Sequence, residues 1–161
     1  MRIGFGYDSH RFADAGNAVQ NLGGVPIPDC PKLEGHSDAD VLIHAITDAL
    51  LGAAALGDIG SHFPDSDQRW ANADSSALLG SVMKEIGDAG YAVGNVDATV
   101  ICETPRIGPH VGAIRARLAA ILAVPESSVS VKGKTNEGMD AVGEGLGIAV
   151  HAVALLVPRE A

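Results

Sequence analysis

The hydrophobic positions of this chain recur with two spacings, and each spacing predicts a different kind of element. Over residues 2–12 alternate positions are apolar, which is the period of a strand. The positions between them lie on the other face of the strand and include Asp8 and His10. A further extended piece at 19–28 contains the Gly23-Gly24 pair, as expected of a turn or an edge strand. Runs with β-branched character predict three more strands, at 91–103, 128–132 and 147–157.

The helical period is clearest over residues 41–57, which are almost entirely apolar. Asp38 and Asp40 suit the beginning of this helix because carboxylates complement the positive end of its dipole, and Gly57 suits its end. The segment 57–74 that follows is dense in Gly, Pro, Asp and Ser and has no period. It is therefore predicted to be a long ordered loop, which usually has a functional role.

Two more helices are predicted in the second half of the chain. One covers 74–89 with Asp74 as its N-cap, and the other begins at Pro109. Strands that alternate with helices indicate a sheet covered by helices on one face. The length of 161 residues fits one domain over 1–161, with a core large enough to need no disulfide.

Composition and charge narrow the functional class. The formal net charge of −9 opposes binding to nucleic acid or to an anionic membrane, so a phosphorylated ligand needs locally placed cations or a metal. Cys30 and Cys102 are far apart in the sequence and are expected to be free and reduced. The first ten residues are typical of structure rather than of a leader, and no apolar run is long enough to span a membrane. We therefore expect a cytoplasmic protein.

Asp8, His10 and His44 form the strongest candidate for a metal site. Asp8 and His10 are two apart on a strand and so point the same way, while His44 lies in the apolar helix. Taken separately, each residue also fits a structural role. In that interpretation Asp48, one turn further along the helix, accepts the second ring N–H of His44. Taken together they offer three zinc ligands and leave one coordination position open, as in catalytic zinc sites.

Two other polar segments are candidates for ligand contacts. The loop that contains Asp58, Asp65 and Asp67 offers carboxylates to ligand hydroxyls, or is a solvated acidic turn. The segment 132–137 places two lysines, a threonine and Glu137 directly after a strand. This corner suits a phosphate with a hard cation, or is an exposed turn.

Taken together, several strings resemble the family of 2-C-methyl-D-erythritol 2,4-cyclodiphosphate synthases, enzymes of the non-mevalonate isoprenoid pathway. The strings run nearly end to end: GFGYDSHRF, GHSDADVLIHAITDALLGAAALGDIG, HFPDSD, GNVDATVICETPRIGPH and VSVKGKTNEGMDAVGEG. The resemblance implies an α+β subunit with a mixed, four-stranded type of sheet. It also implies a chorismate-mutase-like homotrimer whose active sites lie between subunits.

The resemblance also implies the reaction and its metals. The family converts 4-diphosphocytidyl-2-C-methyl-D-erythritol 2-phosphate to the 2,4-cyclodiphosphate and CMP, without a protein nucleophile. Its zinc ligands fall on Asp8, His10 and His44, with one Zn²⁺ per subunit. Glu137 matches the ligand of a Mg²⁺ or Mn²⁺ ion that binds with the substrate diphosphate. No nucleic-acid or membrane partner is expected.

The same resemblance assigns substrate contacts along the chain. His36 and Thr135 match catalytic positions beside the reacting phosphates. The full set implied to contact the cytidine diphosphate-type substrate is Asp8, His10, His36, Ser37, Asp58, Ile59, Gly60, Phe63, Pro64, Asp65, Ser66, Asp67, Cys102, Glu103, Thr104, Pro105, Arg106, Ile107, Gly108, Lys134, Thr135, Asn136 and Glu137.

The chain departs from many family members at Ala141 and Glu144, where an aromatic residue and an arginine are common. Because these positions lie near the central cavity of the trimer, we expect weak or no binding of an isoprenoid diphosphate there. Two other functions fit some of the same residues. A zinc phosphodiesterase would activate water at the open position, and a trimeric binding module would use zinc structurally.

Overall fold

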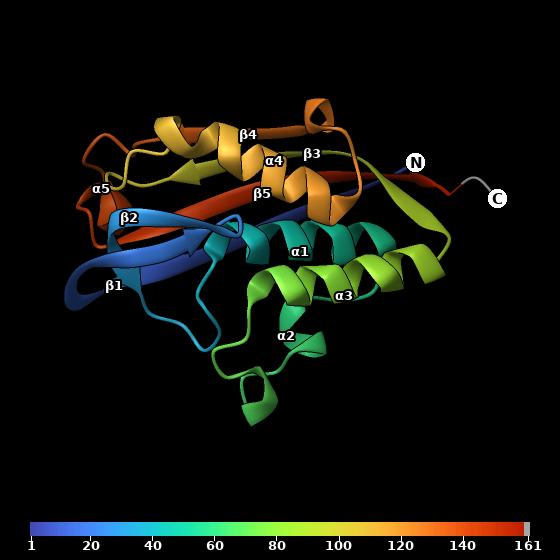
Figure 1. The fold of residues 1–161 in the computed structure, drawn as a ribbon, viewed down its shortest axis with the longest axis horizontal. Coiled ribbons are helices and arrows are strands. Elements are labelled where there is room, and N and C mark those ends of the chain that lie inside the picture. Colours follow the sequence, from blue (N-terminus) through green and yellow to red (C-terminus); the bar gives the residue numbers. More distant parts are fainter. Residues whose placement is uncertain (160–161) are drawn as a thin grey trace.

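The computed structural model describes residues 1–159, with the side chains of Ala15 and Asn17 left aside. Within this range the strands form one five-stranded sheet in the order β2-β1-β5-β3-β4 (Figure 1). The β3–β4 pair is parallel and the other pairs are antiparallel, so the predicted mixed sheet is confirmed. The strand bounds are β1 Arg2–Leu22, β2 Val25–Leu33, β3 Tyr91–Ile101, β4 Val129–Lys134 and β5 Gly147–Pro158.

The fifth strand corrects the expectation of a four-stranded sheet. β1 continues past Phe12 to Leu22 and then turns at Gly23 and Gly24 into β2, with which it pairs antiparallel. The two glycines have φ of 63° and 71°, and left-handed backbone at both positions suits a tight hairpin. Residues 19–22 of this continuation belong to the extended piece predicted at 19–28. Residues 13–18 were not predicted, because they show no apolar alternation.

Three long helices cover one face of the described sheet, as predicted: α1 Val41–Ala54, α3 Ser75–Asp88 and α4 Val111–Leu122 (Figure 1). α1 ends before the predicted Gly57, because Ala55 adopts a φ of 61° and its N–H bonds to the carbonyl of Gly52. The predicted loop 57–74 contains the short helix α2 Ile59–His62 and a 3₁₀ turn, Gln68–Trp70. A second short helix, α5 Asp140–Gly143, was not predicted. None of the described helices is long and apolar enough to cross a membrane.

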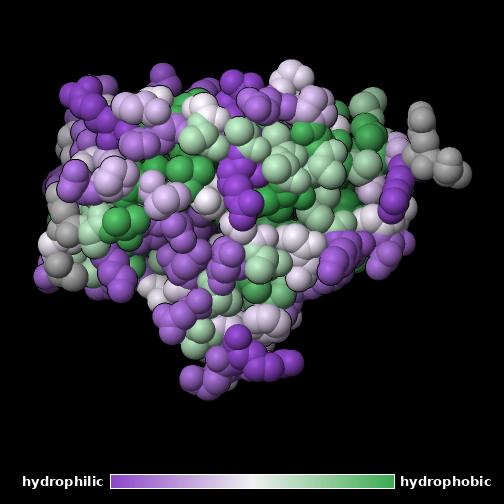
Figure 2. All heavy atoms as spheres, in the orientation of Figure 1, coloured by the Kyte–Doolittle hydropathy of each residue, from purple (hydrophilic) through white to green (hydrophobic). Residues whose placement is uncertain are grey.

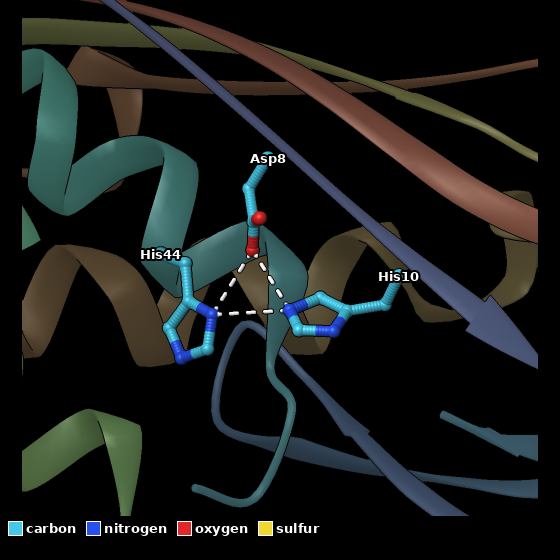
Figure 3. Close-up of side chains that lie close together, drawn as sticks. All are labelled: Asp8, His10 and His44. Atoms are coloured by element: carbon cyan, nitrogen blue, oxygen red, sulfur yellow. Dashed lines mark hydrogen bonds and ion pairs between the residues drawn. The ribbon is translucent and has the colours of Figure 1, made fainter. Parts of the chain in front are cut away.

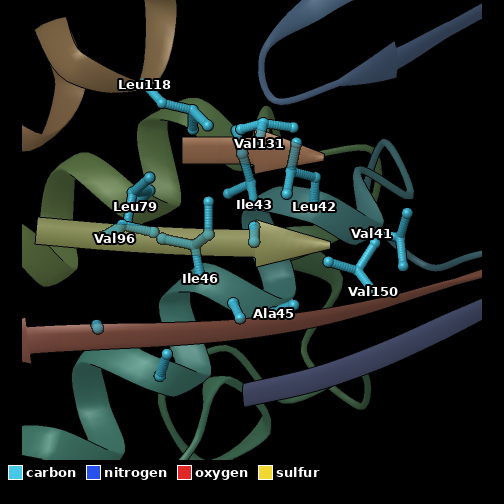
Figure 4. Close-up of a cluster of buried hydrophobic side chains, with 14 of the residues drawn as sticks. Val41, Leu42, Ile43, Ala45, Ile46, Leu79, Val96, Leu118, Val131 and Val150 are labelled. Atoms are coloured by element: carbon cyan, nitrogen blue, oxygen red, sulfur yellow. The ribbon is translucent and has the colours of Figure 1, made fainter. Parts of the chain in front are cut away.

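The core lies between the three long helices and the sheet, and it is built mainly from aliphatic side chains (Figure 4). α1 approaches β1 closely because Gly4 and Gly6 face the helix backbone. A Cβ atom at Gly6 would lie 2.0 Å from the carbonyl oxygen of Ala45. The other face of β1 is open: Ile3, Phe5 and Tyr7 are 72%, 62% and 49% exposed. The glycine face of β1 is therefore the buried one, and it carries Asp8 and His10 toward α1.

Asp40 fastens the β1–β2 hairpin to the first turn of α1. It is fully buried, and its carboxylate accepts hydrogen bonds from the backbone N–H groups of Gly23 at 2.9 Å, Gly24 at 2.7 Å and Ile43 at 3.1 Å. Burial raises the pKa of Asp40, although the three N–H groups act against that shift. Since the carboxylate is the acceptor that these buried N–H groups share, it fixes where α1 begins.

An Asp40→Ala variant is expected to lose about 2–3 kcal/mol of unfolding free energy, because buried donors without an acceptor cost roughly 1–3 kcal/mol each. Thermal melting at one fixed protein concentration measures the loss, as a melting temperature lower by about 5–10 °C for a chain of this size. Asp88→Ala, at the exposed end of α3, is the matched control and should melt like the unmodified chain. An unchanged melting temperature for Asp40→Ala would contradict the structural role.

Candidate metal centre and active site

Asp8, His10 and His44 converge at one end of the α1–β1 contact (Figure 3). Asp8 and His10 point toward α1 because they share the buried face of β1 with Gly4 and Gly6. His44 lies in the first turn of α1, and the close approach of this helix brings its ring to the strand. The sequence prediction that these residues meet is confirmed.

The ligand atoms of the three side chains are mutually close. Asp8 Oδ2 lies 3.0 Å from His10 Nε2 and 3.0 Å from His44 Nδ1, and the two nitrogens are 3.4 Å apart. Two nitrogens bound tetrahedrally to one zinc ion at about 2.0–2.1 Å stand roughly 3.3 Å apart. The three side chains are 12–26% exposed, so the group is accessible from one side.

The outward nitrogens of the two histidines are held by other groups. His10 Nδ1 lies at hydrogen-bond distance from the carbonyl of Glu34, and His44 Nε2 lies 3.0 Å from Ser75 Oγ and 3.1 Å from Ser37 Oγ. Ser75 Oγ donates in turn to Asp38. With the outer nitrogens carrying protons, the inner nitrogens present lone pairs to the centre, which is the arrangement of metal-ligating histidines.

Asp48 does not take the role that the sequence suggested for it. His44 uses serine oxygens as its outer partners, while Asp48 Oδ1 accepts the backbone N–H of Ile59 at 2.8 Å. Burial raises the pKa of Asp48, although this N–H bond acts against the shift. Asp48 therefore anchors the loop after α1 instead of the histidine.

Charges at the centre shift the pKa values of two ligands in opposite directions. Burial alone would raise the pKa of Asp8, but hydrogen bonds and charge from His10 and His44 outweigh it and lower the pKa to about 2. Burial alone would lower the pKa of His10, but the Asp8 carboxylate outweighs it, so that this pKa is raised. Asp8 is thus an ionised ligand at neutral pH, and the three donors fit a divalent metal ion.

A cavity of about 270 Å³ opens directly onto this centre. His36 and Ser37 line it from the segment before α1, and Ile59, Gly60 and Phe63 line it from the loop after α1. The complete lining is Asp8, His10, Gly35, His36, Ser37, His44, Ile59, Gly60, Phe63, Asp65, Trp70 and Leu78. Two segments on either side of α1 therefore enclose the open side of the metal centre.

A second cavity, of about 540 Å³, contains most of the other predicted contacts. It lies between the loop after β3 and the end of β4, and its lining is Cys102, Glu103, Pro105, Arg106, Ile107, Gly108, Pro109, Gly133, Lys134 and Thr135. Asn136 and Glu137 follow directly, and Thr135 Oγ1 lies 3.1 Å from Glu137 Oε1. The two linings share no residue, so the chain presents the predicted contacts in two separate cavities.

Comparison with known proteins identifies the family. The model described as the YgbB family matches residues 1–157. The chain belongs to the YgbB family. A curated relative from Salinibacter ruber, named 2-C-methyl-D-erythritol 2,4-cyclodiphosphate synthase, is 53% identical over 156 residues, which cover 97% of this chain and 98% of the relative. A relative of the same name from Ectopseudomonas mendocina is 55% identical over 157 residues, covering 98% and 99%.

Solved structures of YgbB-family proteins have the same fold. The bifunctional IspDF from Campylobacter jejuni superposes with a TM-score of 0.92 at 34% identity, and the match covers 99% of this chain and 42% of that protein. The CDP complex of IspF from Plasmodium falciparum gives a TM-score of 0.86 at 36% identity, covering 99% and 97%. The family resemblance inferred from the motifs is confirmed.

Some predicted contacts of this YgbB-family chain point elsewhere or lie outside both linings. The carboxylate of Asp58 caps α2 by accepting from Ser61, and Asp67 pairs with Arg69. These partners lower the pKa of each aspartate. Pro64, Ser66 and Thr104 also lie outside the two linings, next to residues that belong to them.

Sequence reasoning missed four residues at the metal cavity of this YgbB-family chain: Gly35, Ser75, Trp70 and Leu78. Ser75 is the most informative, because it is fully buried beneath His44. It lies 31 positions from His44 in the chain, so no local spacing marks it as a partner. Trp70 was missed because it lies in the segment predicted to be a loop, although it is the only tryptophan in the sequence.

A Ser75→Ala variant of this YgbB-family chain is expected to bind the metal about 10- to 100-fold more weakly, because His44 loses the group that orients its ring. Competition with a chromophoric chelator measures the affinity. Ser76→Ala is the matched control, since Ser76 is buried beside Ser75 but does not contact the histidine. Equal affinity in Ser75→Ala and in the control would show that Ser37 alone holds the ring.

Proposed function

We propose that this chain cyclises 4-diphosphocytidyl-2-C-methyl-D-erythritol 2-phosphate, as expected of a cyclodiphosphate synthase. An oxygen of the 2-phosphate bonds to the β-phosphorus while the bond from that phosphorus to the α–β bridging oxygen breaks, and CMP leaves. The observation that carries the proposal is a metal triad that opens onto a cavity lined by His36 and Ser37 in a chain of this family.

The residues present fit two metal ions. Asp8, His10 and His44 would hold zinc, because two imidazoles and a carboxylate that leave a position open are its usual catalytic set. Glu137 would hold Mg²⁺ or Mn²⁺ together with the substrate diphosphate, since Mg²⁺ is commonly bound by one carboxylate plus phosphates. When bound, these ions supply Lewis acidity and neutralise charge on the phosphates.

The side chains themselves bind and orient the reacting groups. His36 Nε2 is buried and has no hydrogen-bond partner among the described residues, so it is available to a phosphate oxygen at the cavity. Ser37 lies beside it, and Thr135 brings a hydroxyl to the diphosphate from the second cavity. Because no protein nucleophile is required, the rate depends on holding the 2-phosphate in line with the β-phosphorus.

We propose that the cytidine part occupies the second cavity, between Cys102 and Gly108. The CDP complex of the Plasmodium falciparum relative supports a cytidine nucleotide as the ligand. Asp65 lines the metal cavity and would meet a hydroxyl of the methylerythritol part.

The two halves of this site are expected to meet between subunits of a homotrimer. The two cavities of one subunit have no lining residue in common. The sheet face that bears Ile3, Phe5 and Tyr7 is also uncovered in one subunit, and an exposed apolar sheet face is typical of an interface. Cross-subunit assembly of the halves makes a monomer inactive.

The whole chain, residues 1–161, is proposed to be one synthase domain in the cytoplasm. Cys30 and Cys102 are both buried free thiols. Burial raises their pKa to about 11 and about 12, which keeps them protonated and unreactive. Free thiols are typical of a reducing compartment.

Phosphorus NMR tests the proposed reaction directly. Protein incubated with the substrate and Mg²⁺ should produce the cyclic diphosphate and CMP in equal amounts, and a zinc chelator should stop both. Repeating the reaction in ¹⁸O-water separates cyclisation from hydrolysis, because only a phosphodiesterase puts solvent oxygen into its product. Metal binding without any turnover would favour the binding-module alternative.

A further inference from the structure

One wall of the metal cavity projects from the body of the protein. We call residues 58–65 the pocket wall, because Ile59, Gly60, Phe63 and Asp65 all line the cavity. Figure 1 shows α2 projecting below α1 and α3, with the 3₁₀ turn Gln68–Trp70 beneath it, and the tip of this projection is hydrophilic in Figure 2. None of the four α2 residues is buried, although Phe63 packs partly against the core. Hydrophobic burial therefore holds the pocket wall only at one end.

Polar contacts join the pocket wall to both neighbouring helices. At its start, the backbone N–H of Ile59 donates to Asp48 on α1 at 2.8 Å. At the end of α2, His62 Nε2 lies 2.9 Å from the carbonyl oxygen of Leu56, and His62 Nδ1 lies 3.2 Å from Glu85 Oε2 on α3. His62 thus bridges the segment directly after α1 and the last turn of α3.

The surroundings of the His62 ring suit two donated hydrogen bonds. Both groups that face the ring are hydrogen-bond acceptors: the carbonyl oxygen of Leu56 at Nε2 and the carboxylate of Glu85 at Nδ1. The His62 side chain is 20% exposed and that of Glu85 is 43% exposed. A half-exposed pair of this kind adds little to the free energy of unfolding. It does hold the backbone around His62, and so it fixes the direction of the side chains that come next in the chain.

We propose that His62 and Glu85 are positioning residues that set the pocket wall at the correct distance from the metal centre. Neither residue lines the cavity, so both act through their neighbours. Phe63, the next residue, stands edge-on to Trp70 at 5.1 Å between ring centroids, and both rings line the cavity. The inference rests on the proposed function in assuming that the methylerythritol part of the substrate lies against this wall.

Steady-state kinetics test the positioning role. Glu85→Ala and His62→Leu are each expected to raise KM about three- to fivefold with kcat within about twofold, the range of a half-exposed ion pair. The double variant should be no worse than His62→Leu, because Glu85 acts on the pocket wall through His62. Glu85→Gln should recover much of the loss, since its amide oxygen still accepts from Nδ1. Asp88→Ala, on the same helix, should leave KM unchanged.

A second measurement needs no turnover. Trp70 is the only tryptophan in the sequence, so intrinsic fluorescence reports on the pocket wall. Acrylamide should quench it more strongly in Glu85→Ala than in the unmodified chain or in Asp88→Ala. Unchanged quenching with unchanged KM would overturn the positioning role. If the unmodified chain shows no cyclisation, the proposed function fails, and the quenching result still decides whether the pair holds the wall.

Discussion

His44→Ala is expected to lose the bound metal and to lower kcat/KM by about 10³-fold or more, while the protein keeps its fold. The loss follows from removing one of the three converging donors, because a catalytic metal supplies several kcal/mol of charge stabilisation. The fold is expected to survive because α1 is capped by Asp40 and packed by its aliphatic residues, not by the histidine. Metal analysis after dialysis, far-ultraviolet circular dichroism and the cyclisation assay measure the three effects.

Thr47→Ser is the matched control, since Thr47 lies one turn further along α1 and bonds only to the carbonyl of Ile43 among its described contacts. This variant should retain metal and activity. Global unfolding of His44→Ala would instead indicate a structural ion. Full activity with metal still bound would show that the ligand set is wrong.

Gly6→Ala is expected to cost about 4 kcal/mol of unfolding free energy, at the upper end for overpacking. The added Cβ would lie 2.0 Å from the carbonyl oxygen of Ala45 and 2.7 Å from the backbone nitrogen of Ala49. Both are backbone atoms, so α1 has to move away from β1 as a unit. Because α1 carries His44 and β1 carries Asp8, the variant should also bind metal more weakly.

Thermal melting at fixed protein concentration and a metal competition assay measure these two effects of Gly6→Ala. Gly80→Ala is the control, and its expected effect on the free energy of unfolding has the opposite sign. Gly80 lies inside α3 with open space where its Cβ would be, so alanine should stabilise the helix by roughly 0.5–1 kcal/mol. If Gly6→Ala and the unmodified chain had the same melting temperature, α1 would not pack as closely against β1 as the structure shows.

Much of the candidate site could be predicted from the sequence because its key relationships are local. Asp8 and His10 share a face since residues two apart on any strand do so, and Asp38 and Asp40 mark where the helix carrying His44 begins. The helix bounds came close for the same reason: capping residues and the apolar period act over one or two turns. Ala55 is the exception, because a non-glycine residue in the left-handed region leaves no signal in the sequence.

Relationships between distant residues could not be predicted in this way. Ser75 and Glu85 act on His44 and His62 across gaps in the chain that no periodic pattern spans. The suggestion that Asp48 supports His44 failed because helical spacing allows the contact but does not require it. In the structure Asp48 finds a backbone N–H at the start of α2 instead.

The order and type of the main elements, the family and the convergence of Asp8, His10 and His44 could be predicted from the sequence alone, since these depend on local conformation and on motifs. Which face of β1 is buried depends instead on how the elements pack together. Alternation separates two faces, but the steric fit of α1 onto Gly4 and Gly6 selects the glycine face and leaves Phe5 exposed. Packing also places the predicted contacts of this chain in two separate cavities, because loops far apart in the chain are positioned by the elements that carry them.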